Sequence, residues 1–282
     1  MLPILLAGAS ALVWGTADFC GGKAVARSRS AAAGQALSVT VFSQLCAIPM
    51  IAFFLLVVPG QFGVSALLWG TAAGAAGLFG IVLLYQGLAS GAMAVVAPTT
   101  AVTAAAVPLA GGLLLGERPG WVPLTGAVCA VTAIALVSLG GSGRLGAGWR
   151  PVGLALASGA LFGLFFVLLA RAGEGAGMWP LAAARFAAVP LGLLLLLPMR
   201  GSLRLERRVA WLAAVAGVLD ISANGLYLLA SYQGQISVVA PVASLYPAST
   251  VLLAFAVDKE RLRPVQLGGL VLAGIALVLA AG

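Results

Sequence analysis

Three ionisable residues lie well inside long apolar segments of this sequence: Asp18, Arg185 and Asp220. A charged side chain inside a lipid bilayer is costly, so it usually pairs with another charge, faces water or belongs to a transport path. The chain contains no histidine, which removes the usual proton shuttle and the commonest metal ligand. Binding or proton-transfer chemistry therefore depends first on these three side chains.

Asp220 is followed by Asn224 and Tyr227 at i+4 and i+7, so the three side chains share one helix face. A carboxylate, an amide and a phenol in one row can bind a polar solute and fix its orientation. Arg185 lies about eight residues, and Asp220 about eleven, from the same end of their helices, a difference in depth of about 5 Å. We expect an Arg185–Asp220 ion pair, which is either a structural tie between two helices or an anchor or gate for substrate.

Asp18 follows Trp14 by four residues on one helix face and precedes Lys23 by five. Two interpretations stay open for it. Near a helix end the carboxylate can extend to the membrane surface, or it can face a cavity and take up a proton. Other polar and aromatic residues complete the expected substrate-binding lining, together with those above: Trp14, Gln44, Tyr85, Gln86 and Tyr246.

The segments that carry these residues belong to a strongly apolar chain. Of its 282 residues 62% are hydrophobic and 8% are charged, and the mean hydropathy is +1.14. Soluble proteins carry roughly 25% charged residues, and a helix that spans a bilayer needs about 20 apolar residues. We expect an all-α integral membrane protein with ten transmembrane helices, over residues 3–22, 33–58, 64–89, 92–115, 119–140, 151–172, 177–198, 209–231, 236–256 and 263–281.

One motif occurs twice, at an offset of 143 positions, since Val95-Val96-Ala97-Pro98 has its counterpart in Val238-Val239-Ala240-Pro241. A series of small residues recurs at the same offset: Gly126, Ala130 and Ala133 correspond to Gly269, Ala273 and Ala276. We therefore expect two five-helix repeats over residues 1–140 and 151–282, joined by a linker over 141–150. Because five is odd, the second repeat is inverted in the membrane, and such repeats build transporters with a substrate site near the midplane.

Four prolines are expected to act as hinges, because a proline frees a backbone carbonyl inside its helix. They are Pro98 and Pro108 in the first repeat, and Pro241 and Pro247 in the second. Two Glu-Arg pairs, Glu117-Arg118 and Glu260-Arg261, end the repeated helices, where we expect ion pairs that steady the hairpins. The small residues Gly70, Gly74 and Gly77 share one face of the helix over 64–89, which we expect to be a close packing face.

The net charge of +8 arises from residues in short loops between apolar segments, so we expect no nucleic-acid partner. Twelve basic residues fall on one side of the expected membrane topology, and only Arg118 and Arg171 on the other. The positive-inside rule then places both termini outside the cytoplasm. Cys20, Cys46 and Cys129 lack any metal-ligand spacing, and we expect no metal and no cofactor.

Several paired motifs resemble the EamA branch of the drug/metabolite transporter superfamily. They are Trp14-Gly15 with Phe162-Gly163, Pro98 with Pro241, Gly116-Glu117, and Arg185-Phe186. The second repeat departs from the pattern with Lys259-Glu260, and the first has Gln44 in place of the arginine. The resemblance implies ten helices around a central cavity that opens alternately to either side, and carriage of amino acids, sugars or other metabolites. The resemblance also implies cytoplasmic termini, which contradicts the distribution of basic residues. We keep the orientation that the basic residues predict, with both termini outside.

We expect a secondary transporter in the inner cell membrane that works by alternating access and exports a small polar or amphipathic metabolite such as an amino acid. The chain has no phosphate-binding loop of the Walker type, so the driving force is a gradient of substrate or of protons. A sugar uptake carrier of the same fold is the alternative. A membrane-embedded lipid-modifying enzyme is more remote, because it needs a catalytic cluster, and we expect no enzymatic activity. Its expected partners are the metabolite, the lipid bilayer and protons, and a chain holding both repeats can act as a monomer.

Overall fold

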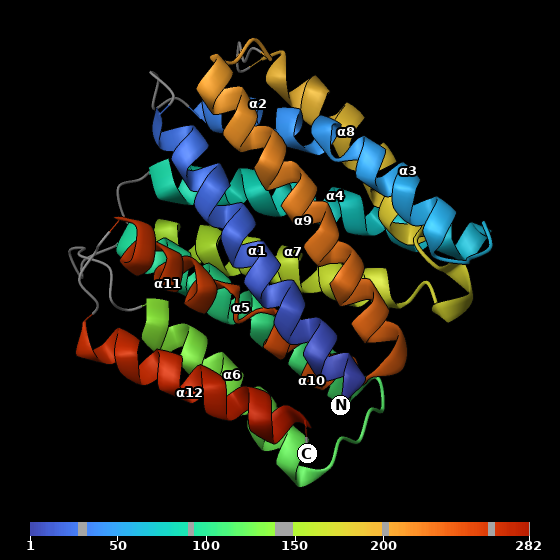
Figure 1. Cartoon of the computed structure of the whole chain (residues 1–282), viewed down its shortest axis with the longest axis vertical. Helices are drawn as coiled ribbons and strands as arrows, with labels where there is room; N and C mark the ends of the chain where they lie inside the picture. The colour runs from blue at the N-terminus through green and yellow to red at the C-terminus, as the bar shows by residue number, and fades with distance from the viewer. Residues whose placement is uncertain (28–32, 90–92, 139–148, 199–202, 259–262, 282) are drawn as a thin grey trace.

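The computed structural model describes residues 1–27, 33–89, 93–138, 149–198, 203–258 and 263–281 (Figure 1). Within these ranges all regular structure is helical. The first half forms α1 Leu2–Arg27, α2 Ala33–Cys46, α3 Ile48–Val57, α4 Val64–Ala89, α5 Met93–Leu114 and α6 Trp121–Ser138. The second half forms α7 Trp149–Ala170, the short 3-10 helix η1 Glu174–Ala176, α8 Trp179–Leu196, α9 Arg207–Gln233, α10 Ile236–Ala243, α11 Tyr246–Asp258 and α12 Pro264–Ala281.

Eight spans in the described part of the chain are long and apolar enough to cross a membrane. Two of them, Gly34–Val57 and Ile236–Val257, each join two consecutive helices, α2 with α3 and α10 with α11. The helices α5 and α6 add two shorter apolar segments. Together these are the ten helices expected, and the prediction of an all-α, multi-pass membrane protein is confirmed.

Two of the expected helices are interrupted. The segment expected over 33–58 has a break at Ala47, between α2 and α3. The break occurs because Pro49 has no N–H to donate to the carbonyl one turn earlier. The two helices together still form one apolar span over Gly34–Val57, as expected for the segment over 33–58. The segment over 236–256 breaks between α10 and α11, immediately before Pro247. That break was expected from the proline.

Pro98 and Pro108 behave differently, because α5 continues from Met93 to Leu114 through both of them. Neither proline interrupts α5, and their role as hinges stays a prediction. A single missing hydrogen bond is tolerated where packing on neighbouring helices holds the backbone, and α5 packs closely along α7. Nothing is described of the Pro98 side chain.

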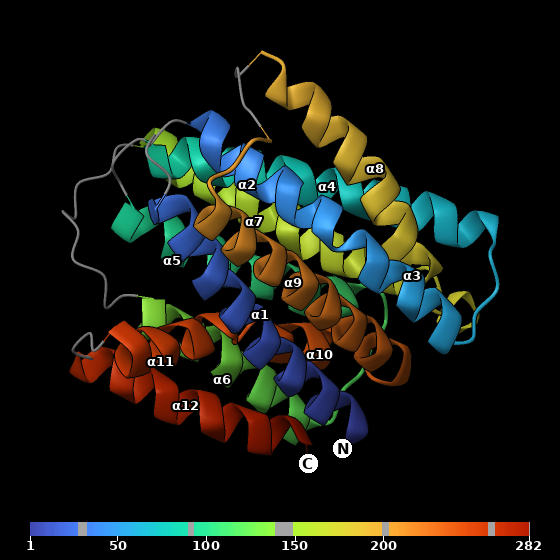
Figure 2. The ribbon, with the colours of Figure 1, turned by 45° about the horizontal axis from the view of Figure 1, so that its top comes forward.

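Helix pairing is reciprocal between the two halves. The helix α1 packs most extensively on α9, and its counterpart α7 packs on α4. Likewise α5 packs on α7, while α1 packs on α10 and α11. The last helices of the halves, α6 and α12, pack on one another at one side of the molecule (Figures 1 and 2). This exchange of partners is what an inverted repeat produces, and both chain ends lie near one another (Figure 1).

Small residues form the close helix contacts, as expected. A methyl group on Gly70 would collide with the carbonyl of Pro180, and one on Gly74 with the carbonyl of Ala184, so α4 needs both glycines to approach α8. On α6 and α12, Gly126 and Gly269 have similarly close neighbours. The alanines of the repeated series are all buried: Ala130, Ala133, Ala273 and Ala276. The expected packing faces are confirmed for Gly70, Gly74 and the repeated series, whereas Gly77 meets the Phe165 ring of α7.

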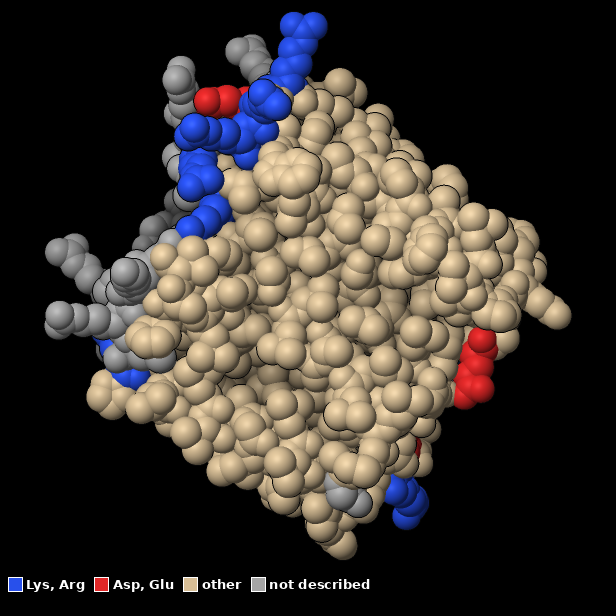
Figure 3. All heavy atoms as spheres, viewed as in Figure 1, with Lys and Arg blue, Asp and Glu red and all other residues tan. Residues whose placement is uncertain are grey.

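Basic side chains gather at one end of the helices (Figure 3). Among the described residues that end holds Lys23, Arg27, Arg150, Arg204, Arg207, Arg208 and Arg263, and the other end holds Arg118 and Arg171. The expected linker over 141–150 falls largely outside the described residues, as do Lys259, Glu260 and Arg261. The three cysteines are free thiols. The charged end is the one that the positive-inside rule assigns to the cytoplasm.

Candidate substrate-binding site

Three helices bring polar groups together around the Asp220 carboxylate. Arg185 of α8 donates through Nη2 to Asp220 Oδ2 at 2.5 Å, which makes the expected ion pair. Trp14 of α1 donates through Nε1 to Asp220 Oδ1 at 2.9 Å. Asn224 of α9 donates through Nδ2 to the same oxygen at 3.2 Å and to the Asp220 carbonyl at 2.7 Å. One carboxylate thus ties α1, α8 and α9 together.

The two members of the ion pair are unequally buried. The Arg185 side chain is 13% exposed and the Asp220 side chain 38% exposed. Arg185 Nε and Asn224 Oδ1 are buried and have no hydrogen-bond partner among the residues that the structure describes. A buried donor or acceptor left unpaired is unfavourable, so the cluster keeps two polar atoms that a further molecule or a rearrangement could satisfy.

Asp18 lies one helical turn beyond Trp14 on the same face of α1, and its side chain is exposed. It is close enough to Asp220 and Tyr246 for its charge to act on both. Lys23, five residues further along α1, places its ammonium 4.6 Å from the centre of the Phe19 ring. Among the described residues Asp18 has no ion-pair partner. It therefore faces α9 and α11 as an unpaired carboxylate, which favours the cavity-facing interpretation.

Aromatic rings pack around Trp14. Its ring centre lies 5.4 Å from Phe166, 6.1 Å from Tyr227 and 6.3 Å from Tyr246. Tyr227 is fully buried, and its hydroxyl donates to the Phe166 carbonyl at 3.0 Å. Tyr227 is therefore a buried support for the Trp14 ring. Tyr246, in contrast, is only partly buried.

Gly15 lets α11 approach α1 beside this cluster. A methyl group on Gly15 would collide with Ser249 Oγ and with the Tyr246 carbonyl. Ser249 Oγ donates to the Ala11 carbonyl at 2.8 Å, and Thr250 Oγ1 donates to the Gly15 carbonyl at 3.2 Å. The Trp14-Gly15 pair therefore has two roles, since the indole reaches Asp220 and the glycine admits the start of α11.

The corresponding contact in the other half is apolar. The pair Phe162-Gly163 of α7 takes the place of Trp14-Gly15, and a methyl group on Gly80 of α4 would lie 3.1 Å from the Phe162 ring. Phe166, which follows Phe162 by four residues, takes the place of Asp18. Sequence analysis did not select Phe166, although comparison of the repeats at this spacing would have found it. The polar cluster thus occurs where α1 meets α9, and the corresponding contact of α7 with α4 has no such cluster among the described residues.

Gln44 and Gln86 make none of the described hydrogen bonds to Asp220. Gln44 is 7% exposed, and its Oε1 has no hydrogen-bond partner. It follows Ser43, whose carbonyl contacts α9 at Gly217, one turn before Asp220. Gln86 is exposed near the end of α4, and the Tyr85 side chain lies outside the described part of the structure.

Glu117 has a role that the sequence did not show. Its carboxylate accepts hydrogen bonds from the backbone N–H groups of Ile236 and Ser237, each at 2.8 Å. These are the first residues of α10, so Glu117 caps a helix of the other half and offsets its positive end. Gly112 leaves the room that this contact needs. The expected ion pair with Arg118 is therefore wrong, because the Glu117 carboxylate is engaged by backbone donors.

The apolar helices, their reciprocal pairing and the buried charged cluster define a multi-pass membrane protein with the architecture of a transporter. Residues 149–282 match the EamA-like transporter family, which confirms the resemblance inferred from the motifs. A solved structure described as "Crystal structure of protein" has a TM-score of 0.75 and 17% identity, over 98% of this chain and 96% of its own. At that identity the likeness supports the fold alone. No curated protein matches the sequence.

Proposed function

We propose that this protein is a secondary transporter that exports a small polar metabolite with an amino group, such as an amino acid, by alternating access. The observation that carries the proposal is the Asp220 cluster, a charged assembly at mid-depth between α1, α8 and α9. The family match supports a transporter role. The substrate and the driving force are inferred from the chemistry of the cluster.

An amino acid carries two charges that complement this cluster. Its carboxylate can compete with Asp220 for the guanidinium of Arg185, which has an unpartnered Nε and binds carboxylates through paired donors. Its ammonium group can pair with the exposed carboxylate of Asp18. The neighbouring rings of Trp14 and Tyr246 add attraction for a cation and cover an apolar side chain.

Asp18 is also the group that we propose for proton coupling. Among the described residues it is the carboxylate of the cluster without a cationic partner, whereas Asp220 is held by Arg185. A proton on Asp18 would neutralise the charge that otherwise attracts an ammonium group. Proton and substrate would then compete for one carboxylate, which is sufficient to couple their movements in opposite directions.

Alternating access requires helices that can bend near the cluster. The break between α10 and α11 adjoins Tyr246, and Pro247 removes the hydrogen bond that would close it. The pause between α2 and α3 lies one turn beyond Ser43, where α2 contacts α9. We propose these two breaks as the bending points of the transport cycle, with Pro241 and Pro247 as hinge residues.

Sugar uptake remains the second candidate because two amide oxygens are buried without partners, Gln44 Oε1 and Asn224 Oδ1. Sugar hydroxyl groups are donors that such acceptors can bind. A sugar, however, offers no charge to Arg185 or Asp18. The charged groups therefore favour a substrate with an amino group.

The test is transport by the purified full chain in proteoliposomes, with labelled amino acids and labelled sugars, with and without an imposed pH gradient. We expect counterflow of at least one amino acid, and loss of the response to the pH gradient in Asp18→Asn. We expect Arg185→Gln to abolish or strongly weaken substrate binding, because it removes the cation assigned to the substrate carboxylate. Transport of sugars alone would support the alternative and overturn our choice of substrate.

The matched control is Glu174→Gln, which removes an exposed carboxylate from the connection before α8. We expect this variant to transport like the unmodified protein. If all three variants transport normally, the cluster is structural and the proposed site is wrong.

A further inference from the structure

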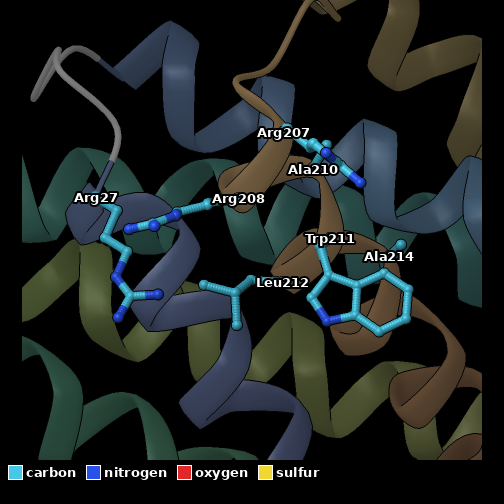
Figure 4. Close-up of a pocket in the computed structure, with 7 residues that line it drawn as sticks. All are labelled: Arg27, Arg207, Arg208, Ala210, Trp211, Leu212 and Ala214. Carbon is cyan, nitrogen blue, oxygen red and sulfur yellow. The ribbon is translucent and has the colours of Figure 1, made fainter.

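A pocket of about 650 Å³ lies at the basic end of the molecule, where α1 ends and α9 begins. Its polar lining comes from Arg27 of α1 and from Arg207 and Arg208 of α9 (Figure 4). Its apolar lining comes from the next two turns of α9: Ala210, Trp211, Leu212 and Ala214. The pocket is separate from the Asp220 cluster and has no part in the proposed transport chemistry.

The three arginines have no acidic partner within the described residues, and all three are exposed. Figure 4 shows Arg27 and Arg208 side by side, although they come from different helices. Neighbouring positive charges repel one another, and an anion bound between the two guanidinium groups would relieve that repulsion. Arginine binds phosphate through several donors at once, which makes a phosphate the best-fitting anion.

The order of residues along α9 matches the layers of a bilayer. The apolar span of α9 begins at Arg207, and that of α1 ends at Val25, two residues before Arg27. Trp211 follows one turn deeper and is 70% exposed, as is typical of the aromatic belt below the headgroups. Ala214 lies about 10 Å deeper than Arg207 along the helix axis. The pocket therefore changes from charged to apolar over the distance between a lipid phosphate and its first acyl carbons.

We propose that this pocket binds an anionic phospholipid, with the phosphate between Arg27 and Arg208 and an acyl chain that passes over Leu212 toward Trp211. Basic pockets of this kind between transmembrane helices on the cytoplasmic side suit anionic headgroups. A soluble phosphate would satisfy the arginines and leave the apolar wall uncovered. A lipid satisfies both parts of the lining, and the surrounding bilayer supplies it at high local concentration.

The bound lipid would join the ends of the two helices that meet at Asp220. Directly beneath the arginines, Ala24 of α1 packs with Val209 and Ala213 of α9 in a small buried cluster. A phosphate shared by Arg27 and Arg208 would hold this contact closed from outside. Anionic lipid is therefore expected to stabilise the packing of α1 against α9 in addition to occupying the pocket.

The test uses the full chain, reconstituted in vesicles of equal amounts of phosphatidylglycerol and phosphatidylcholine, then extracted in detergent and weighed by native mass spectrometry. We expect the unmodified protein to retain phosphatidylglycerol in preference to phosphatidylcholine. In the double variant Arg27→Gln/Arg208→Gln we expect about thirtyfold weaker retention, from two headgroup contacts of about 1 kcal/mol each. Retention of the two lipids in equal amounts by the unmodified protein would overturn the proposal.

The matched control is Arg150→Gln/Arg263→Gln, which removes the same charge from two exposed positions at the same end of the molecule. We expect this control to retain the lipid. An equal loss in both double variants would show that general charge attraction, and not the pocket, holds the lipid. A third variant, Arg27→Lys/Arg208→Lys, keeps the charge and should recover part of the retention, which also shows that the substituted chain folds.

Inorganic phosphate distinguishes the two sources of the anion. We expect 10-fold excess phosphate over the lipid to leave the retained phosphatidylglycerol in place, because phosphate cannot cover the apolar wall. Displacement of the lipid by phosphate alone would assign the pocket to a soluble anion and overturn the lipid proposal.

Discussion

Removal of one member of the Arg185–Asp220 pair at a time separates a structural tie from a substrate anchor. Asp220→Asn leaves the guanidinium of Arg185, which is 13% exposed, without a counter-ion. Arg185→Gln leaves a carboxylate that is 38% exposed and still accepts hydrogen bonds from Trp14 and Asn224. The two substitutions therefore have unequal costs, although they break the same ion pair.

The magnitudes follow from this difference in burial. An unpaired buried charge costs about 3 kcal/mol at the low end of measured values, which we assign to Asp220→Asn. The more exposed carboxylate left by Arg185→Gln costs less, about 1–2 kcal/mol. The double variant Arg185→Gln/Asp220→Asn leaves no charge unpaired, so we expect it to cost less than the sum of the single changes.

Thermal unfolding of the purified variants in detergent measures these costs. We expect Asp220→Asn to have the lowest melting temperature, with the double variant no lower than Asp220→Asn. Glu206→Gln, which alters an exposed acid at the start of α9, serves as the control and should melt like the unmodified protein. A larger loss from Arg185→Gln than from Asp220→Asn would refute the reasoning from burial.

Transport by the double variant then decides the role of the pair. If the pair is a structural tie, the double variant regains stability and transports substrate. If it is a substrate anchor, the double variant folds and remains inactive. We expect the second outcome, because Arg185 is the cation that we assign to the substrate carboxylate.

Three further predictions concern positions around the cluster. Glu117→Ala removes both acceptors at the start of α10 and should cost about 1–2 kcal/mol, measured as a lower melting temperature; an unchanged value would contradict the capping role. Gly15→Ala should destabilise the protein by about 1–3 kcal/mol through its collision with Ser249 and the Tyr246 carbonyl, whereas Gly22→Ala, which meets no atom within 4 Å, should be neutral or stabilising; equal effects would be inconsistent with the packing. Pro247→Ala restores a backbone donor at the break between α10 and α11, so it should slow turnover while the substrate affinity stays within about twofold. Pro108→Ala, in the continuous α5, is the control and should leave turnover unchanged. Equal turnover in both variants would rule out the hinge.

The sequence predicted the helices well because lipid imposes a length of apolar segment that can be counted. It also predicted the Arg185–Asp220 contact, because two charges at similar depth on adjacent helices have few alternatives to pairing. The pairing of Asp220 with Trp14 was not predicted. It joins residues 206 positions apart, and nothing local to either residue identifies the other.

Prolines show the same limit in another way. Pro108 and Pro247 occupy helices that correspond in the two halves, yet α5 continues and α10–α11 breaks. A missing N–H frees a carbonyl in both cases, and the neighbouring helix decides whether the backbone stays helical. In the sequence, Glu117 is likewise an ordinary acid at the end of a helix. Its contact with the start of α10 becomes known only from the structure. Contacts between halves are the part of this fold that a single sequence does not show.

The replacement of the Trp14–Asp220 contact by the apolar Phe162–Gly80 contact has a consequence for the resting protein. If the two halves were identical in sequence, exchanging their conformations would turn the molecule inside out without changing its energy, and the empty carrier would face each side half of the time. Here the contact of α1 with α9 is held by hydrogen bonds to a charged group, and the contact of α7 with α4 by a ring packed on a glycine. The two orientations then differ in free energy, so the empty carrier rests facing one preferred side. Such a bias gives the two directions of transport different maximal rates and different half-saturation concentrations, although the ratio of the two stays equal in both directions while no coupling ion takes part.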